Sequence, residues 1–289
     1  MKRLSIIILA IAALVAGCTR EDDITPITPS QPDQIHIKRV YVEQHLVIEA
    51  FDTATLIWDT LGQVHTDKYL SMEWFWNGDR LDSVMQATIY DSYYIYRFTY
   101  DNKGLLTRYD QYLNGVPTGD YVLFYYDSDG RLSRFEQYDE GTIFSSGIID
   151  SYVGNKISHM RYTDNIYDVD INYTFDDSGD NVTEMLVNGL IGSNRLHSTY
   201  TYVHDDHINP FGSNLFFINL PREPYKWMSA NNVLTEFCRT IEGDMEERDT
   251  RTEYLYRYEG DLPVEMTYES HTGTYDAHLA TTITEYYEY

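Results

Sequence analysis

A β-hairpin pattern recurs along most of this chain, and its clearest copy spans residues 122–135. Apolar residues alternate with others from Val122 to Tyr126, which places them on one face of an extended strand. Asp127 then opens a turn, and Gly130 can take the left-handed conformation that closes a type I turn with a bulge. The residues that follow are expected to return as the second strand.

Copies of this hairpin follow one another at a nearly constant spacing. The last aromatic residue before each turn stands 23 to 27 residues after its predecessor, except for a final gap of 56 residues. These aromatic residues are Trp76, Tyr100, Tyr126, Tyr152, Phe175, Tyr202 and Tyr258. One hairpin cannot bury its own apolar face, so the copies must pack side by side. We therefore expect an all-β fold with little helix, an antiparallel β-hairpin repeat meander curved into an open spiral or a partly closed barrel.

The return strands carry a second regularity, because two apolar residues stand three positions apart in five of them. These pairs are Leu81/Val84, Leu106/Tyr109, Leu132/Phe135, Ile157/Met160 and Val182/Met185. In a flat strand, a spacing of three would put the two residues on opposite faces. We expect a β-bulge after the first residue of each return strand, which would also add twist; the alternative is that both faces are partly covered.

The first 17 residues carry the pattern of an export signal. Lys2 and Arg3 precede an apolar segment, Leu4–Val15, that is too short to span a bilayer as a stable helix. The following residues, Val15-Ala16-Gly17-Cys18, resemble a bacterial lipobox, in which the cysteine becomes the lipidated N-terminus after cleavage. We expect a lipoprotein signal peptide at 1–17 and lipidation of Cys18. The alternative is an ordinary secretory signal with a chance cysteine.

A basic residue and an acidic cluster follow Cys18 directly, in Thr19–Asp23. This order resembles the surface-export signal of Bacteroidota-type lipoproteins, which implies an outer-membrane lipid as partner and a protein that faces the cell exterior. Prolines at 26, 29 and 32 make residues 18–34 a flexible tether. Residues 35–289 are expected to form a single β-hairpin repeat domain, in which the strands before Tyr69 cap the repeats and residues 209–232 are an insertion.

The composition excludes one class of partner. The net charge is −25, and it becomes −27 when Lys2 and Arg3 leave with the signal peptide. Nucleic-acid binding requires a basic surface, so we expect no nucleic-acid partner. Of the two cysteines, Cys238 would remain alone as a buried small residue, without a disulfide. The 28 tyrosines suit either cross-strand stacking or stacking on sugars, and we favour the structural role for any given ring.

The motif aromatic-x-Tyr-Asp-x-x-Gly-x-Leu occurs at Phe98–Leu106 and again at Phe124–Leu132. It resembles the tyrosine-aspartate (YD) repeats of Rhs-type proteins. Together with the lipobox, it makes the chain similar to an uncharacterised family of Bacteroidota-type surface lipoproteins with YD β-hairpin repeats, over residues 74–289. In Rhs proteins these repeats form a large β-spiral shell, which a chain of this length could not build around another protein. The resemblance implies no catalytic residues, and we expect no cofactor.

Ligand-binding candidates lie in the insertion, because it is the segment least like the repeats. Exposed there, Phe211, Tyr225 and Trp227 would form a platform for a sugar or a peptide. Buried, they would plug the open end of the sheet, and we favour the plug slightly.

The most ligand-like polar cluster is His204, Asp205, Asp206 and His207, next to the insertion. Imidazole and carboxylate groups could meet a divalent metal, but a turn constrains four consecutive side chains poorly. We therefore expect a solvated polar turn and no metal.

No catalytic motif is present in the sequence. Glu236, Glu242 and Glu265 could serve a glycosidase, yet no spacing singles out a pair of carboxylates. We expect a non-enzymatic binding module for glycan or protein on the cell surface. The alternatives are a structural envelope scaffold without a small ligand and, less favoured, a glycan-cleaving enzyme. Exposed coplanar rings on one face would favour binding, and a cleft with two close carboxylates would favour the enzyme.

Overall fold

The structure is a computed structural model, and it describes residues 12–13, 36–52, 57–78, 80–88, 92–211, 215–216, 228–243, 248–274 and 277–289. Cys18, Tyr225 and Trp227 lie outside the described residues. Within these ranges, no helix is long and apolar enough to cross a lipid bilayer.

The described residues are almost entirely β-strand, which confirms the predicted fold class. The strands are β1 (Ala12–Ala13), β2 (Arg39–Asp52), β3 (Ile57–His65), β4 (Tyr69–Asn77), β5 (Arg80–Ala87), β6 (Tyr93–Tyr100), β7 (Leu106–Leu113), β8 (Val116–Tyr126), β9 (Leu132–Asp139), β10 (Thr142–Val153), β11 (Lys156–Thr163), β12 (Tyr167–Phe175), β13 (Val182–Ile191), β14 (Asn194–Ile208), β15 (Leu215–Phe216), β16 (Asn231–Glu242), β17 (Arg248–Glu259), β18 (Leu262–Thr274) and β19 (Ala277–Glu288).

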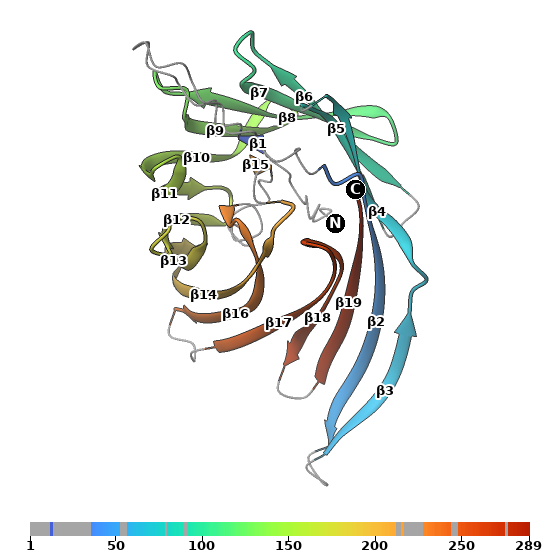
Figure 1. Cartoon of the computed structure of the whole chain (residues 1–289). Coiled ribbons are helices and arrows are strands. Elements are labelled where there is room, and N and C mark those ends of the chain that lie inside the picture. The colour runs from blue at the N-terminus through green and yellow to red at the C-terminus, as the bar shows by residue number, and fades with distance from the viewer. Residues whose placement is uncertain are drawn as a thin grey trace.

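These strands form a closed antiparallel barrel in chain order (Figure 1). The last strand, β19, pairs with β2 from Ala277↔Ala50 to Glu288↔Arg39, which closes the ring. The short strands β1 and β15 pair with each other in a separate two-stranded sheet. Of the two curved forms expected from the sequence, the structure takes the barrel, because β19 and β2 join the two ends of the meander.

The segment before Tyr69 does not cap an open stack of repeats, because β2 lies between β19 and the first repeat. One half of β2 pairs with β3 and the other half with β4. The strands β3 and β4 therefore run in line along β2 as one interrupted strand. At the interruption, the backbone N–H of Thr66 continues the ladder by donating a 2.9 Å hydrogen bond to the Gln44 carbonyl.

The predicted bulges are present where the return strands begin. In the hairpin of β8 and β9, Tyr125 pairs with Arg134 and Tyr126 pairs with Leu132, so Ser133 is the extra residue. The hairpins β4–β5, β6–β7, β10–β11, β12–β13 and β17–β18 shift register at the same place. A bulge of this kind lets two apolar residues three apart share a face, and it increases strand twist.

Each YD turn is held by its aspartate and its glycine. Asp127 accepts hydrogen bonds through Oδ1 from the backbone N–H groups of Asp129 and Arg131, and each bond is 2.9 Å long. Gly130 has φ +78°, a left-handed conformation that suits glycine. We call the barrel end that carries these turns the YD end and the other end the opposite end. Arg39 of β2 and Glu288 of β19 lie at the YD end, because Arg39 pairs with Glu73 near the first of these turns.

The tyrosine of the YD motif joins one hairpin to the previous one. The Tyr126 hydroxyl donates to the backbone carbonyl of Leu106 over 2.7 Å. The β7–β8 ladder begins beyond this carbonyl, at Arg108↔Leu123, so the phenol supplies a partner that the sheet does not. The same bond recurs in Tyr100–Leu81, Tyr152–Leu132 and Tyr289–Pro263. Burial raises the pKa of these tyrosines, to about 12 for Tyr152, so they remain donors at neutral pH.

Replacing Tyr126 with phenylalanine is expected to destabilise the barrel by about 1–2 kcal/mol, because the Leu106 carbonyl loses its donor away from water. Urea denaturation followed by circular dichroism measures the change. Tyr125→Phe is the matched control, since the Tyr125 hydroxyl points outward to Glu136, and its effect should stay within about 0.5 kcal/mol. Equal losses in the two variants would contradict a joining role for Tyr126.

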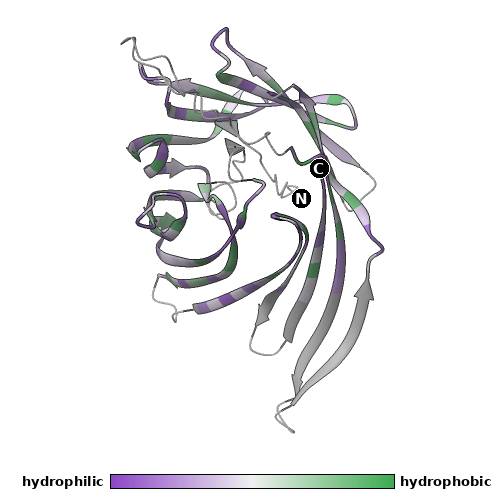
Figure 2. Ribbon diagram, in the orientation of Figure 1, coloured by the Kyte–Doolittle hydropathy of each residue, from purple (hydrophilic) through white to green (hydrophobic). Residues whose placement is uncertain are grey.

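The two faces of the barrel wall differ in polarity. Inward side chains from successive strands form one hydrophobic cluster, which includes Val84, Leu106, Val122, Ile171 and Met185. The outward positions carry many charged residues, and hydrophilic and hydrophobic residues are interspersed along the strands in Figure 2. The core of the barrel therefore lies on its inner surface.

Candidate functional site

The insertion joins the barrel at the YD end, between β14 and β16. In the ladder of these strands, His204 pairs with Val233 and Ile208 pairs with Asn231, so three residues of β14 face one residue of β16. This irregular bulge interrupts the alternation of inward and outward side chains along β14 at Asp205. We call Asp205, His207, Asn209, Ser229, Asn232 and Tyr258 the insertion anchor.

Asp205 is the centre of the insertion anchor. Its carboxylate accepts hydrogen bonds from the backbone N–H groups of His207 and Asn232, at 3.0 and 3.1 Å, and from the Asn232 amide at 3.3 Å. The Tyr258 hydroxyl donates to the same carboxylate, and the His207 ring stacks on Tyr258 with centroids 4.0 Å apart. Burial and the bond to Asp205 raise the pKa of Tyr258. With only 8% of the Asp205 side chain exposed, this carboxylate is a structural hub and not a solvated turn.

A second set of bonds ties the insertion to the neighbouring YD turn. The Asn209 amide donates to the Ser229 carbonyl over 3.0 Å, and the Ser229 hydroxyl accepts from the Val182 backbone N–H at 3.0 Å. Asn181 and Asn231 exchange two hydrogen bonds, each 3.0 Å long. Both ends of the insertion are thereby fixed to the barrel.

The four residues expected to form a polar turn point in different directions. The His204 ring lies 3.1 Å from the Ser229 hydroxyl, and burial lowers its pKa. Asp206 is exposed, with 98% of its side chain accessible, and its carboxylate lies 3.2 Å from the His207 ring. In the part of the chain that the structure describes, no three histidine, cysteine, aspartate or glutamate side chains are placed to hold a metal ion.

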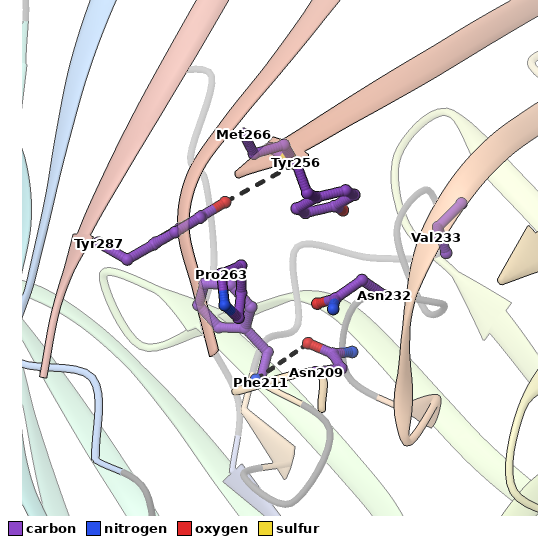
Figure 3. Close-up of a pocket in the computed structure, with 8 residues that line it drawn as sticks. All are labelled: Asn209, Phe211, Asn232, Val233, Tyr256, Pro263, Met266 and Tyr287. Atoms are coloured by element: carbon purple, nitrogen blue, oxygen red, sulfur yellow. Dashed lines mark hydrogen bonds between the residues drawn. The ribbon is translucent and has the colours of Figure 1, made fainter. Parts of the chain in front are cut away.

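Phe211, the one described ligand-binding candidate, points into the barrel. Its ring meets Tyr287 edge-on at 5.8 Å and Trp74 at a tilt, 6.5 Å away. A cavity of about 20 Å³ lies beside it, lined by Asn209, Phe211, Asn232, Val233, Tyr256, Pro263, Met266 and Tyr287 (Figure 3). This volume holds about one water molecule. For Phe211, the geometry favours the plug over the sugar platform.

Three outer tyrosines on β8 and β9 have ring faces that are already in contact with other side chains. On β8 and β9, Tyr121 and Tyr138 stack on each other with centroids 4.6 Å apart. The Arg108 guanidinium lies 4.0 Å from the Tyr121 ring, and Arg134 lies 4.2 Å from Tyr125. These cation–π and stacking contacts occupy the surfaces that a sugar ring would need.

A polar cluster that the sequence did not reveal faces the barrel interior toward the opposite end. We call Gln86, Tyr109, Gln111, Asp120, Gln137, Asp139 and Ser145 the inner polar cluster. The three glutamines occupy the same place in β5, β7 and β9, five residues after the first apolar residue of each return strand. They are buried, with 9%, 4% and 6% of their surface exposed. This recurrence of Gln at an inward position was the available signal.

Two aspartates complete the inner polar cluster. Burial is the main cause that raises the pKa of Asp120, and the neighbouring carboxylate of Asp139 raises it further. The Thr118 hydroxyl, beside Asp120, donates to the Gln111 carbonyl over 3.1 Å. The Ser145 hydroxyl donates to the Gln137 amide oxygen over 3.0 Å. The cluster combines amide, phenol and carboxyl groups, which can both donate and accept hydrogen bonds.

Comparisons with known proteins found similar solved structures but no matching family model or curated protein. No protein-family model matches the sequence, and no curated protein is significantly similar to it. Among solved structures, the chain is similar to a porin-like protein from Bacteroides uniformis, with a TM-score of 0.35 and 13% identity over 85% of this chain and 96% of that one. It is also similar to a porin-like protein from Bacteroides vulgatus, with a TM-score of 0.40 and 12% identity over 84% of this chain and 97% of that one.

Proposed function

We propose that this protein is a lipid-anchored, non-enzymatic binding module for glycan or protein, and that its barrel stands in water on the surface of the outer membrane. The observation that carries the proposal is the polarity of the barrel wall. Charged residues occupy outward positions on strand after strand, whereas the inward side chains form the hydrophobic core. A barrel that spans a membrane has the reverse pattern, with an apolar outer band.

Ion pairs along the outer wall support this reading. The Arg161 guanidinium pairs with Asp150 at 2.8 Å, and Arg257 pairs with Glu265 at 3.0 Å. Such pairs are weak in water, yet one arginine on a lipid-facing strand costs about 2–4 kcal/mol at the bilayer midplane. The outward charged residues of β6 to β18 include Arg97, Arg108, Asp110, Arg134, Glu136, Asp150, Arg161, Asp170, Arg239, Asp249, Arg257 and Glu265.

The position of the tether gives the barrel an orientation in this proposal. Residues 18–34 lead from Cys18 toward β2, and β2 begins at the YD end. Lipidation of Cys18 would hold the YD end near the membrane. The opposite end, with the inner polar cluster, would then face away from the membrane toward partners.

The non-enzymatic part of the proposal rests on where the candidate carboxylates lie. Glu265 is outward and paired with Arg257, while the charge of Glu236 acts on the buried Tyr202 inside the barrel. A glycosidase needs two carboxyl groups that flank one bond, about 5–9.5 Å apart. Carboxylates on opposite faces of the wall do not meet that requirement.

Replacing Cys18 with serine tests the anchor. Because serine cannot receive the lipid, the Cys18→Ser protein should leave the membrane pellet entirely and remain folded in buffer without detergent. Fractionation of cells with an outer membrane, followed by circular dichroism of the soluble protein, measures this.

Cys238→Ser is the matched control, since Cys238 is the other cysteine and is buried in β16; this variant should stay with the membrane. If Cys18→Ser remains in the pellet and needs detergent for extraction, the barrel is inserted in the bilayer and the proposal is wrong.

A further inference from the structure

Strand β3 has one neighbour in the sheet where the other strands of the ring have two. Among the residues that the structure describes, it pairs with β2 alone. The hairpin of β5 and β6 does not reach it, because Met72 pairs with Gln86 and β5 therefore ends near the level where β4 begins. In Figure 1, β3 lies at the outer right of the barrel, with no strand on its outer side. We call this side of β3 the open edge.

The hydrogen bonds to β2 show which backbone groups lie on the open edge. The Thr66 N–H donates to the Gln44 carbonyl of β2, and the register with β2 is regular from His65 to Gly62. In an antiparallel ladder, the N–H and C=O groups of successive residues point to opposite sides of the strand. The N–H and C=O groups of Gln63 and His65 therefore point away from β2, whereas those of Val64 point toward it.

The open edge has few of the features that keep strand edges from pairing. Lysine, proline and inward charges are the usual protection of such an edge, together with bulges. The nine residues of β3, Ile57–His65, contain no proline, lysine or arginine, and Asp59 is their one acidic residue. The bulge at Leu61 leaves the ladder regular from Gly62 to His65. An edge of this kind is a template on which an extended segment of another chain can add as a strand.

The charge around β3 defines the chemistry of that segment. Residues 44–65 and 267–284 contain β3 and the adjoining parts of β2, β18 and β19. They include no lysine or arginine and five acidic residues, which are Glu49, Asp52, Asp59, Glu269 and Asp276. Lysine and arginine side chains would be attracted to such a surface. We propose that the open edge of β3 binds a basic, extended segment of another protein as one more strand of the sheet. This inference rests on the proposed binding function and names the class of partner.

A second copy of this chain suits the open edge less well. Each copy carries a net charge of −25, so two copies repel each other. Antiparallel pairing of two β3 strands about a two-fold axis would also reverse one barrel relative to the other. The two YD ends, and the anchors proposed for them, would then point in opposite directions.

Peptide titration of the full-length lipoprotein in detergent micelles tests the open edge. The probe is a fluorescently labelled nonapeptide of alternating lysine and valine, the comparator is the same peptide with glutamate for lysine, and anisotropy measures binding. The lysine peptide should bind at least tenfold more tightly than the glutamate peptide. Gln63→Pro should weaken this binding at least tenfold, because proline removes an outward N–H and leaves the bonds to β2 in place. Gln63→Thr keeps that N–H and is the matched control, which should bind like the wild type.

Amide hydrogen exchange gives the structural readout. In the free protein, the Val64 amide should be protected and the Gln63 and His65 amides should exchange fast. The lysine peptide should slow exchange at Gln63 and His65 at least tenfold. Continued protection of Val64 in Gln63→Pro would show that the ladder with β2 remains formed in this variant.

Equal binding of the two peptides, binding that Gln63→Pro leaves intact, or binding of neither peptide would overturn the proposal. Slow exchange at Gln63 and His65 in the free protein would also overturn it. Protection that rises with protein concentration would identify a second copy on the edge, and protection at every concentration would identify a segment of the same chain. The Cys18→Ser fractionation judges the surface anchor separately, so a failure of this edge and a failure of the proposed function are distinguishable.

Discussion

Replacing Gly189 with alanine is expected to destabilise the barrel by about 3 kcal/mol or more. Gly189 has φ +154°, which L side chains rarely adopt, and it pairs with Val169 across β12 and β13. A Cβ atom there would lie 2.1 Å from the Asp168 carbonyl oxygen and 2.7 Å from the Val169 Cα. Both contacts are with backbone, so relief requires the two strands to separate.

The matched control is Gly192→Ala in the turn of the same hairpin. Gly192 has φ +60°, and nothing lies within 4 Å of a Cβ atom built on it. This variant should lose only the left-handed preference of glycine, about 1 kcal/mol. Urea denaturation of both variants measures the difference. Losses that agree within about 0.5 kcal/mol would show that backbone contact at Gly189 contributes nothing.

The hairpin repeats could be predicted because their signals are local. An aspartate and a glycine fix each turn within five residues, as in Asp127–Arg131. The spacing of Leu132 and Phe135 reported the bulge, since only an extra residue puts both on the inner face. The spacing of the repeats, the turn residues and the alternation of apolar residues all predict the same local structure in these segments. A sequence specifies its local structure when such signals agree.

Closure of the barrel had no such signal. The pairing of β2 with β19 joins residues more than two hundred positions apart, and neither strand carries the YD motif. Closure depends on the twist accumulated over all the strands and on their stagger, neither of which appears in any single segment. For the same reason, the hydrogen bond from Tyr126 to the Leu106 carbonyl could not be predicted from the residues of one hairpin. That bond requires two hairpins in register and a bulge that leaves the carbonyl beyond the ladder.

The sites were less predictable than the fold. The sequence analysis identified the insertion as the segment least like the repeats, and it interpreted Asp205 as part of a solvated turn. Its main partner, Tyr258, is 53 residues away, and only the barrel brings the two together. The inner glutamines recur at one position of the repeat. An inward strand position is expected to be apolar, however, so the sequence pattern did not mark Gln86, Gln111 and Gln137 as buried residues.

Replacing Asp205 with alanine should therefore have a large effect on the YD end, about 3 kcal/mol. The change removes an acceptor of four hydrogen bonds and leaves buried donors from His207, Asn232 and Tyr258 without it. Asp206→Ala is the matched control, because the Asp206 side chain is 98% exposed. Its removal should change the free energy of unfolding by no more than about 0.5 kcal/mol. Denaturant titration of the two variants measures the difference in the free energy of unfolding.

Amide hydrogen exchange locates the effect of Asp205→Ala. The backbone N–H groups of His207 and Asn232 donate directly to Asp205, so their exchange should accelerate in this variant and not in Asp206→Ala. The Tyr109 amide, in β7 far along the barrel, should keep its protection in both, since the repeat hairpins do not depend on the insertion anchor. If exchange at His207 and Asn232 is unchanged, or if Asp206→Ala costs as much as Asp205→Ala, the carboxylate does not hold the insertion. In that case the Asn181–Asn231 and Asn209–Ser229 bonds carry the attachment instead.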